Sequence, residues 1–179
     1  MRILLRTACL AGLWMLPIAA ATPVMAETQA SLPGGASSVQ ETFDAWTVTC
    51  SEQKGAKHCM LSQQQVDQHS QQRVIAIELS VVPSETVQGT LILPFGLALQ
   101  RGVQLQIDTK PAAPPQPIRT CIPIGCLVSL IFDAKYVAAL RKAATLKVNA
   151  VADSGKAADF SISLKGFPAA LDRAVVLAK

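Results

Sequence analysis

The sequence is poor in aromatic residues, in charges and in histidine. Aromatic side chains make up 4% of the 179 residues and charged side chains 16%, with two histidines and a net charge of +4. Proteins that bind nucleic acid usually need a basic stripe and aromatic side chains that stack on bases. The composition therefore argues against nucleic acid as a partner, and against an aromatic platform for sugars.

The sequence also lacks the motifs of common catalytic and metal sites. It has no Gly-x-Ser-x-Gly elbow and no glycine-rich phosphate loop. Adjacent strand residues point to opposite faces, so His58 and Cys59 are poorly placed to act as a base and thiol pair. The spacing of Cys50, His58, Cys59 and His69 does not match paired zinc ligands. We therefore predict a chain that is not an enzyme and that holds no metal or cofactor.

Two pairs of carboxylates are the remaining candidates for acid and base chemistry. They are Glu41 with Asp44, and Asp153 with Asp159. Each pair lies in sequence that is typical of loops, where charged side chains are normally solvated. We predict solvated charges at these positions.

The N-terminus has the three parts of a cleavable secretory signal, which we predict over residues 1–26. Arg2 and Arg6 precede an apolar run over residues 8–21, and small residues end at Ala26. A transmembrane anchor is the alternative, but Pro17 interrupts a run that is too short to span a bilayer. We expect a periplasmic protein with no membrane span after cleavage, and association with the outer membrane or secretion as further possibilities.

Removal of the signal peptide changes the number of cysteines from five to four. An even number of cysteines in an exported chain indicates two disulfides. Three connectivities are open, and we favour the local one because each pair can meet across a short loop. A redox site at the second pair is disfavoured, since four residues separate its cysteines where redox motifs have two. The local pairs are Cys50 with Cys59 and Cys121 with Cys126.

Alternating apolar and polar residues predict strands through most of the mature chain. Residues 27–42 are small and polar and predict a flexible leader, so residues 43–179 are expected to form a single domain. Leu91–Leu99 and Leu127–Phe132 are more continuously apolar, as in strands covered on both faces or in a short buried helix, and Pro94, Gly96 and the β-branched residues of the second segment favour strands. The predicted inward-facing sets are Trp46, Val48 and Cys50; Ile75, Ile77, Leu79 and Val81; Val103, Leu105 and Ile107; Leu146, Val148 and Ala150; and Phe160, Ile162 and Leu164.

Two short helices and one extended connector complete the expected elements. Asp133 is a suitable N-cap for a helix over residues 134–142, and Pro168 suits the first turn of a second helix. Lys110–Pro117 is proline-rich and predicts an exposed, extended connector. About eight short strands with so few helices point to an all-β fold, either an antiparallel sandwich, which we favour, or a barrel.

The chain contains an ordered set of short motifs, which are Trp46-Thr47-Val48-Thr49-Cys50, Cys59-Met60, Leu93–Leu99, Gly102-Val103, Ile107-Asp108, Cys121, Gly125-Cys126 and Leu164–Phe167. Over roughly residues 43–171, this set resembles the invasion-associated locus B family of Gram-negative envelope proteins. The resemblance implies an immunoglobulin-like β-sandwich, a place in the cell envelope and, for pathogenic members, a part in host-cell invasion and virulence. It implies no catalytic residue. Phe95 stands where the family usually has Leu, and we expect altered packing there.

Three functions are open at this point. The preferred one is a non-catalytic module that binds an unidentified envelope or host surface protein through sandwich edges or loops. The alternative is a periplasmic carrier or sensor of a small apolar ligand, suggested by the Leu- and Ile-rich strands. A hydrolase would have to rely on His58 or His69 as its base, because these are the only histidines.

Overall fold

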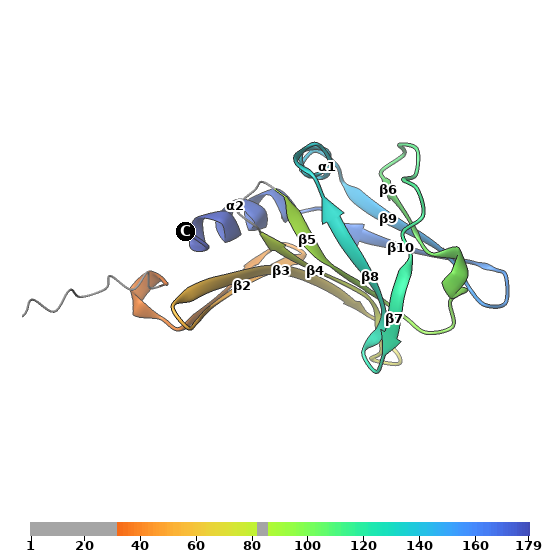
Figure 1. Ribbon diagram of the computed structural model, residues 1–179, viewed down its shortest axis with the longest axis horizontal. Coiled ribbons are helices and arrows are strands. Elements are labelled where there is room, and N and C mark those ends of the chain that lie inside the picture. Colours follow the sequence, from red (N-terminus) through yellow and green to blue (C-terminus); the bar gives the residue numbers. More distant parts are fainter. Residues whose placement is uncertain (1–31, 82–85) are drawn as a thin grey trace, which may run out of the picture.

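The structure is a computed structural model that describes residues 32–81 and 86–179 (Figure 1). Within these ranges the chain forms ten strands, two α-helices and two short 3-10 helices, Pro33–Gly35 and Leu99–Arg101. The strands are β1 (Ser38–Phe43), β2 (Trp46–Gln53), β3 (Ala56–Val66), β4 (Arg73–Val81), β5 (Val87–Leu93), β6 (Gln104–Ile107), β7 (Ile118–Ile122), β8 (Gly125–Phe132), β9 (Thr145–Val151) and β10 (Ala157–Ser163). The helices are α1 (Ala134–Leu140) and α2 (Phe167–Leu177).

The strands form two antiparallel sheets. The large sheet has seven strands in the order β1-β2-β3-β4-β5-β8-β7, and the small sheet has three in the order β10-β9-β6. Strands β1 to β5 are sequential neighbours, an arrangement that antiparallel pairing allows with short turns. The predicted all-β antiparallel sandwich with two short helices is confirmed.

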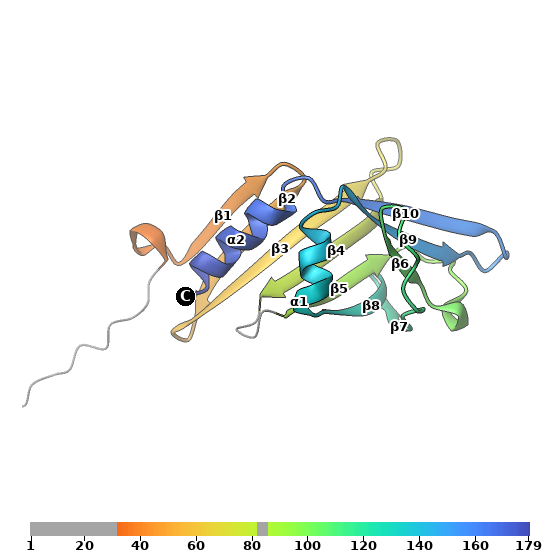
Figure 2. The same ribbon diagram turned by 90° about the horizontal axis from the view of Figure 1, so that it is seen from above.

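One face of the large sheet is covered by the other elements. Helix α2 lies across β1, β2 and β3, while α1 and the small sheet lie over the other part of the sheet (Figures 1 and 2). The indole Nε1 of Trp46 donates to the Ser163 carbonyl at 2.9 Å, and the Trp46 ring packs against Phe167 at 5.1 Å between centroids. A single buried apolar cluster runs through both sheets and both helices.

Strand alternation decides which side chains enter this core. Trp46, Val48 and Cys50 are fully buried on β2. The predicted inward sets on β4 and β9, and the set that begins at Val103 and continues into β6, are buried except Val81, which is partly exposed. Gln63 is the one buried polar side chain among the described residues. The Gln63 side-chain amide makes two hydrogen bonds with the Ser163 backbone. Its Nε2 donates to the Ser163 carbonyl at 2.7 Å, and its Oε1 accepts from the Ser163 N–H at 3.1 Å. This pairing satisfies a polar group that would otherwise be costly to bury.

Helix α1 begins where the sequence predicts, and α2 begins one residue before the predicted start at Pro168. Asp133 caps α1 by accepting a hydrogen bond from the Tyr136 amide at 2.7 Å, although the helix ends at Leu140, two residues before the predicted end. Pro168 lies in the first turn of α2, as expected. Gly166 precedes α2 with a φ of 84°, and a Cβ there would meet the Phe43 carbonyl oxygen. The close approach of α2 to the end of β1 therefore requires glycine.

The predicted leader is partly wrong. Residues 1–31, which include the predicted signal peptide, lie outside the described residues, but Leu32 is buried and Ser38–Phe43 is strand β1. β1 pairs in register with β2 from Ser38 opposite Ser51 to Phe43 opposite Trp46. Backbone pairing with an existing strand supplies hydrogen bonds that the polar composition of the segment does not reveal.

The predicted strand over Leu91–Leu99 is also shorter than expected. β5 ends at Leu93, directly before Pro94, and Leu97 makes only an isolated bridge with Ala152. Phe95 and Leu99 are 62% and 51% exposed. Pro94 cannot donate to a ladder, so the chain leaves the sheet there and places apolar side chains in solvent.

The proline-rich connector is extended and largely exposed, as predicted, but it is not free of backbone pairing. The Ala113 amide donates to the Leu105 carbonyl at 2.8 Å, and Val103 and Gln116 exchange two backbone hydrogen bonds. The connector therefore runs along β6 and covers the outer edge of the small sheet.

Candidate functional site

The four cysteines form the two local disulfides that we favoured. Cys50 and Cys59 face each other across β2 and β3, and Cys121 and Cys126 face each other across β7 and β8. Loop-closure entropy assigns each bond about 2 to 3 kcal/mol for loops of this size. The second disulfide links β7 and β8 next to their turn, so it restricts the conformation of the hairpin at that end of the sheet.

The two histidines do not form a site together. His58 is exposed near the start of β3 and points away from the buried Cys59, whereas His69 lies in the turn after the end of β3. In that turn the Asp67 carboxylate accepts hydrogen bonds from the His69 and Ser70 amides and the Ser70 hydroxyl, which lowers the pKa of Asp67. Over residues 32–81 and 86–179, no group of three or more His, Cys, Asp or Glu side chains is arranged to hold a metal.

The carboxylate pairs separate into ion pairs and exposed charges. Glu41 accepts two hydrogen bonds from Arg173 of α2, at 2.8 and 2.6 Å, and this pairing lowers the pKa of Glu41. Asp44 pairs with Lys165 at 2.9 Å. Asp44 keeps 47% of its side chain exposed, so the prediction of a solvated charge holds there. The prediction is wrong for Glu41, which lies in strand β1 and pairs with a residue more than a hundred positions away in the sequence. Asp153 and Asp159 are exposed.

Exposed apolar side chains gather at the end of the large sheet where the β7–β8 hairpin turns, although the single most exposed one, Ile131 at 73%, lies at the other end of β8. We call the surface at the hairpin turn the hairpin surface and define it by Arg73, Pro94, Phe95, Ile122, Pro123 and Ile124. Phe95, Ile122 and Ile124 are 62%, 40% and 53% exposed. Most of these residues line a pocket of about 560 Å³ between the start of β4, the end of β5 and the hairpin turn. Contiguous exposed apolar side chains of this kind mark interaction sites on many proteins.

A small second core supports the hairpin surface from the outer face of the sheet. Ala76, Ile92 and Leu127 are buried there, with Ile92 directly opposite both of the others on neighbouring strands. Gly125 makes this packing possible. A Cβ at that position would lie 2.9 Å from Cγ2 of Ile92 and 2.5 Å from the Leu93 carbonyl oxygen.

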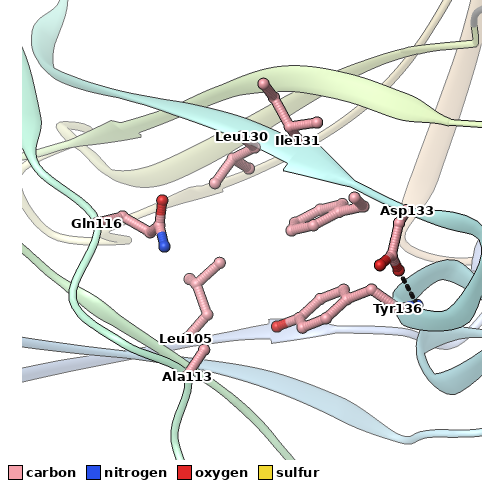
Figure 3. Close-up of a pocket in the computed structure, with 8 residues that line it drawn as sticks. Leu105, Ala113, Gln116, Leu130, Ile131, Asp133 and Tyr136 are labelled. Carbon is pink, nitrogen blue, oxygen red and sulfur yellow. Dashed lines mark hydrogen bonds between the residues drawn. The ribbon is translucent and has the colours of Figure 1, made fainter.

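A different pocket opens at the other end of β8, around Tyr136. It has a volume of about 410 Å³ and lies between the start of α1, the end of β8 and the connector along β6 (Figure 3). The Tyr136 ring stacks on Phe132, with centroids 4.7 Å apart and planes 12° apart. Burial raises the pKa of Tyr136. The hydroxyl of Tyr136 is buried and has no hydrogen-bond partner within the described parts of the chain.

Sequence reasoning did not single out the residues of either surface as sites. The resemblance predicts altered packing at Phe95, whose side chain is mostly in solvent. Ile124 lies between Cys121 and Cys126, where the sequence indicates only a short disulfide-closed loop. Tyr136 is the only tyrosine of the chain, and that rarity was the one available signal for it. Exposure of an apolar side chain, or loss of a partner by a polar one, depends on contacts between distant segments.

None of the helices within the described ranges is long and apolar enough to cross a membrane. The two antiparallel sheets, with one disulfide in the β2–β3 hairpin and one in the β7–β8 hairpin, define a class of protein, the disulfide-bonded antiparallel β-sandwich. A sequence model described as "Invasion associated locus B (IalB) protein" matches residues 46–175. The chain belongs to this family.

Named relatives agree with the assignment. The chain is 47% identical to an Invasion protein B homolog of Brucella abortus, over 84% of this chain and 87% of that protein. It is 36% identical to Invasion protein B of Bartonella bacilliformis, over 84% and 82%. The crystal structure of invasion associated protein B from Bartonella henselae superposes with a TM-score of 0.73 at 34% identity, covering 78% of this chain and 96% of that one.

Proposed function

We propose that this chain is an exported, non-catalytic protein of the cell envelope that binds another protein through the hairpin surface. Two disulfides suit an oxidising compartment, as does the predicted signal peptide over residues 1–26. The relatives are named invasion proteins. For this chain the proposed role is a binding step in the envelope or at a host surface, and host-cell invasion is the process to which that step would belong.

The exposure of Phe95, Ile122 and Ile124 on one end of the sheet is the observation that carries the proposal. Aromatic and aliphatic side chains beside a pocket are typical anchors of protein interfaces. Arg73 adds a cation at the same place, and its guanidinium lies 3.5 Å from the Ile124 carbonyl.

The adjacent sheet edge indicates what kind of partner fits. β7 is the last strand of the large sheet, and β8 is its only strand neighbour among the described residues. The outer edge of such a strand can pair with an extended segment of another polypeptide. We propose a partner that pairs with β7 and places apolar side chains against Phe95 and Ile124. A lipid surface would not use the backbone edge.

The proposal is tested with three forms of the full chain as bait in envelope extract and in host-cell membrane extract. They are the wild type, a Phe95→Ser/Ile124→Ser double variant, and Val176→Ser as the control. Val176 is 58% exposed, an exposed fraction similar to those of Phe95 and Ile124, but it lies on α2. We expect the double variant to lose a partner that both other forms retain. Equal capture by all three forms would contradict the proposal.

Placement of the partner on β7 needs a separate readout. A photo-crosslinking amino acid in place of Arg119, which is exposed on β7, should join the captured protein, whereas the same amino acid in place of Val176 should not. Recovery of the wild type on lipid vesicles with no protein crosslinked at β7 would show that the occupant is a membrane. The intact mass of bait purified from periplasm reports whether cleavage occurs before Glu27.

A further inference from the structure

The Tyr136 hydroxyl is a polar group that the fold buries without satisfying. Within the described chain it has no hydrogen-bond partner, although the ring is held in place by its stack on Phe132. A buried hydroxyl left without a partner loses its hydrogen bonds to water and gains none, so native proteins rarely keep one without a reason.

The two other polar side chains that line the pocket of Figure 3 do not bind this hydroxyl. The Asp133 carboxylate caps α1 by accepting from the Tyr136 amide at 2.7 Å. The Gln116 amide donates to the Pro114 carbonyl at 3.3 Å. Figure 3 shows the hydroxyl directed away from Asp133, toward the side of the pocket on which Leu105 and Ala113 lie, with Gln116 across the opening.

The space around Tyr136 is large enough for a small molecule. The pocket of Figure 3 has about 410 Å³, and a second pocket of about 410 Å³ adjoins it. The two share Leu105, Ala113, Asp133 and Tyr136 in their lining, so Tyr136 stands between them. Binding sites for small ligands have volumes of roughly 300 to 1,000 Å³, with mostly apolar walls and few polar groups.

The chemistry of the lining limits what would bind. Leu105, Leu130 and Phe132 provide apolar and aromatic walls. Because burial raises the pKa of Tyr136, its hydroxyl keeps the proton and acts as a donor near neutral pH. An acceptor on the ligand would then pair with it, while a charged group would lose solvation against the apolar walls.

We propose that the pocket around Tyr136 binds a small, uncharged ligand that has an apolar ring and one hydrogen-bond acceptor, such as a carbonyl oxygen, which pairs with the Tyr136 hydroxyl. Because that hydroxyl oxygen is buried in the structure, a small movement of the side chains around it accompanies this hydrogen bond. The site lies at the end of β8, whereas the hairpin surface lies at its start. It is therefore independent of the protein-binding role proposed above, and variants of one site leave the other intact.

A pair of probe ligands tests the hydrogen bond. Acetophenone and ethylbenzene have the same ring and similar size, but only acetophenone has a carbonyl. We expect the wild-type protein to bind acetophenone about tenfold more tightly than ethylbenzene, a difference that corresponds to about 1.4 kcal/mol. Ligand-observed NMR measures both affinities. Tyr136→Phe should bind both probes with the same affinity, because it removes only the hydroxyl.

Two further measurements separate a ligand site from a structural role. In the absence of ligand, Tyr136→Phe should have an equal or higher melting temperature, since it removes an unsatisfied buried group. Ala113→Leu, which adds bulk to the wall shared by both pockets, should abolish saturable binding of both probes with its melting temperature maintained. The proposal is overturned if the wild type binds neither probe saturably, binds both equally, or if Tyr136→Phe lowers the melting temperature.

Discussion

The two outer edges of the large sheet, which we call the β1 end and the β7 end, each lie near a disulfide but differ in what covers them. At the β1 end, α2 lies over the inner face, and its Phe167 ring is buried against Trp46. Arg173 of the same helix pairs with Glu41 on β1. At the β7 end, a disulfide fixes the hairpin and Phe95 is left 62% exposed beside it.

The contrast separates stability from recognition within one sheet. An end that is covered by a helix and by ion pairs contributes to the core and offers little to a partner. An end that is fixed by a disulfide keeps its shape without being covered, because the cross-link restricts the unfolded chain and needs no packing over the outer face. Apolar side chains can then stay in solvent on a rigid support.

The largest effect that distinguishes the two ends is expected from removing one aromatic ring at each. Phe167→Ala should lower the free energy of unfolding by about 3 to 5 kcal/mol, because it leaves a cavity in the core. Phe95→Ala should change it by no more than about 0.5 kcal/mol. Urea denaturation followed by tryptophan fluorescence measures both. Similar losses in the two variants would show that Phe95 belongs to the core and would remove the contrast.

A smaller effect is expected from Gly166, which joins α2 to the β1 end, and Gly155 serves as its control. Gly155→Ala places a side chain at a φ of 83° in open space, and should cost about 1 to 2 kcal/mol for the backbone conformation alone. Gly166→Ala has a similar φ of 84°, but its Cβ would also meet the Phe43 carbonyl. Thermal denaturation should therefore show a clearly larger loss for Gly166→Ala. Equal losses would mean that α2 can move away from β1 without penalty.

The smallest effect is expected from the ion pair between Glu41 and Arg173, since about a third of each side chain is exposed to solvent, which screens the interaction. The pairing lowers the pKa of Glu41 below its ordinary value of 4.5. Its stabilisation is therefore complete above that value and is lost as the pH falls through the lower pKa of the folded state. Glu41→Gln should be slightly less stable than the wild type at pH 7.

Denaturation of the same variant in acid completes this test. The difference between Glu41→Gln and the wild type should disappear at a pH where Glu41 is protonated in both the folded and unfolded states. Glu52→Gln, on the neighbouring strand, is the control for loss of a carboxylate. A difference that persists unchanged in acid would indicate that the Gln side chain disturbs packing and that the ion pair is not the cause.

Much of the fold was predictable because alternation in a strand is a local property. Trp46, Val48 and Cys50 are inward-facing on period alone, and the cap at Asp133 follows from one side chain and one turn of helix. The local disulfides follow from short spacing in the same way. β1 was missed because its polar residues carry little apolar signal, and its hydrogen bonds come from β2.

The sequence by itself determined the all-β class, the main inward-facing side chains, the two helix starts and a cysteine set that suits local disulfides. Each of these depends on neighbours within a few residues. Tertiary structure alone decided that Glu41 meets Arg173, that Phe95 stays in solvent and that the Tyr136 hydroxyl is buried without a partner. These depend on which distant segments come together, and an isolated stretch of sequence does not contain its partner across the fold.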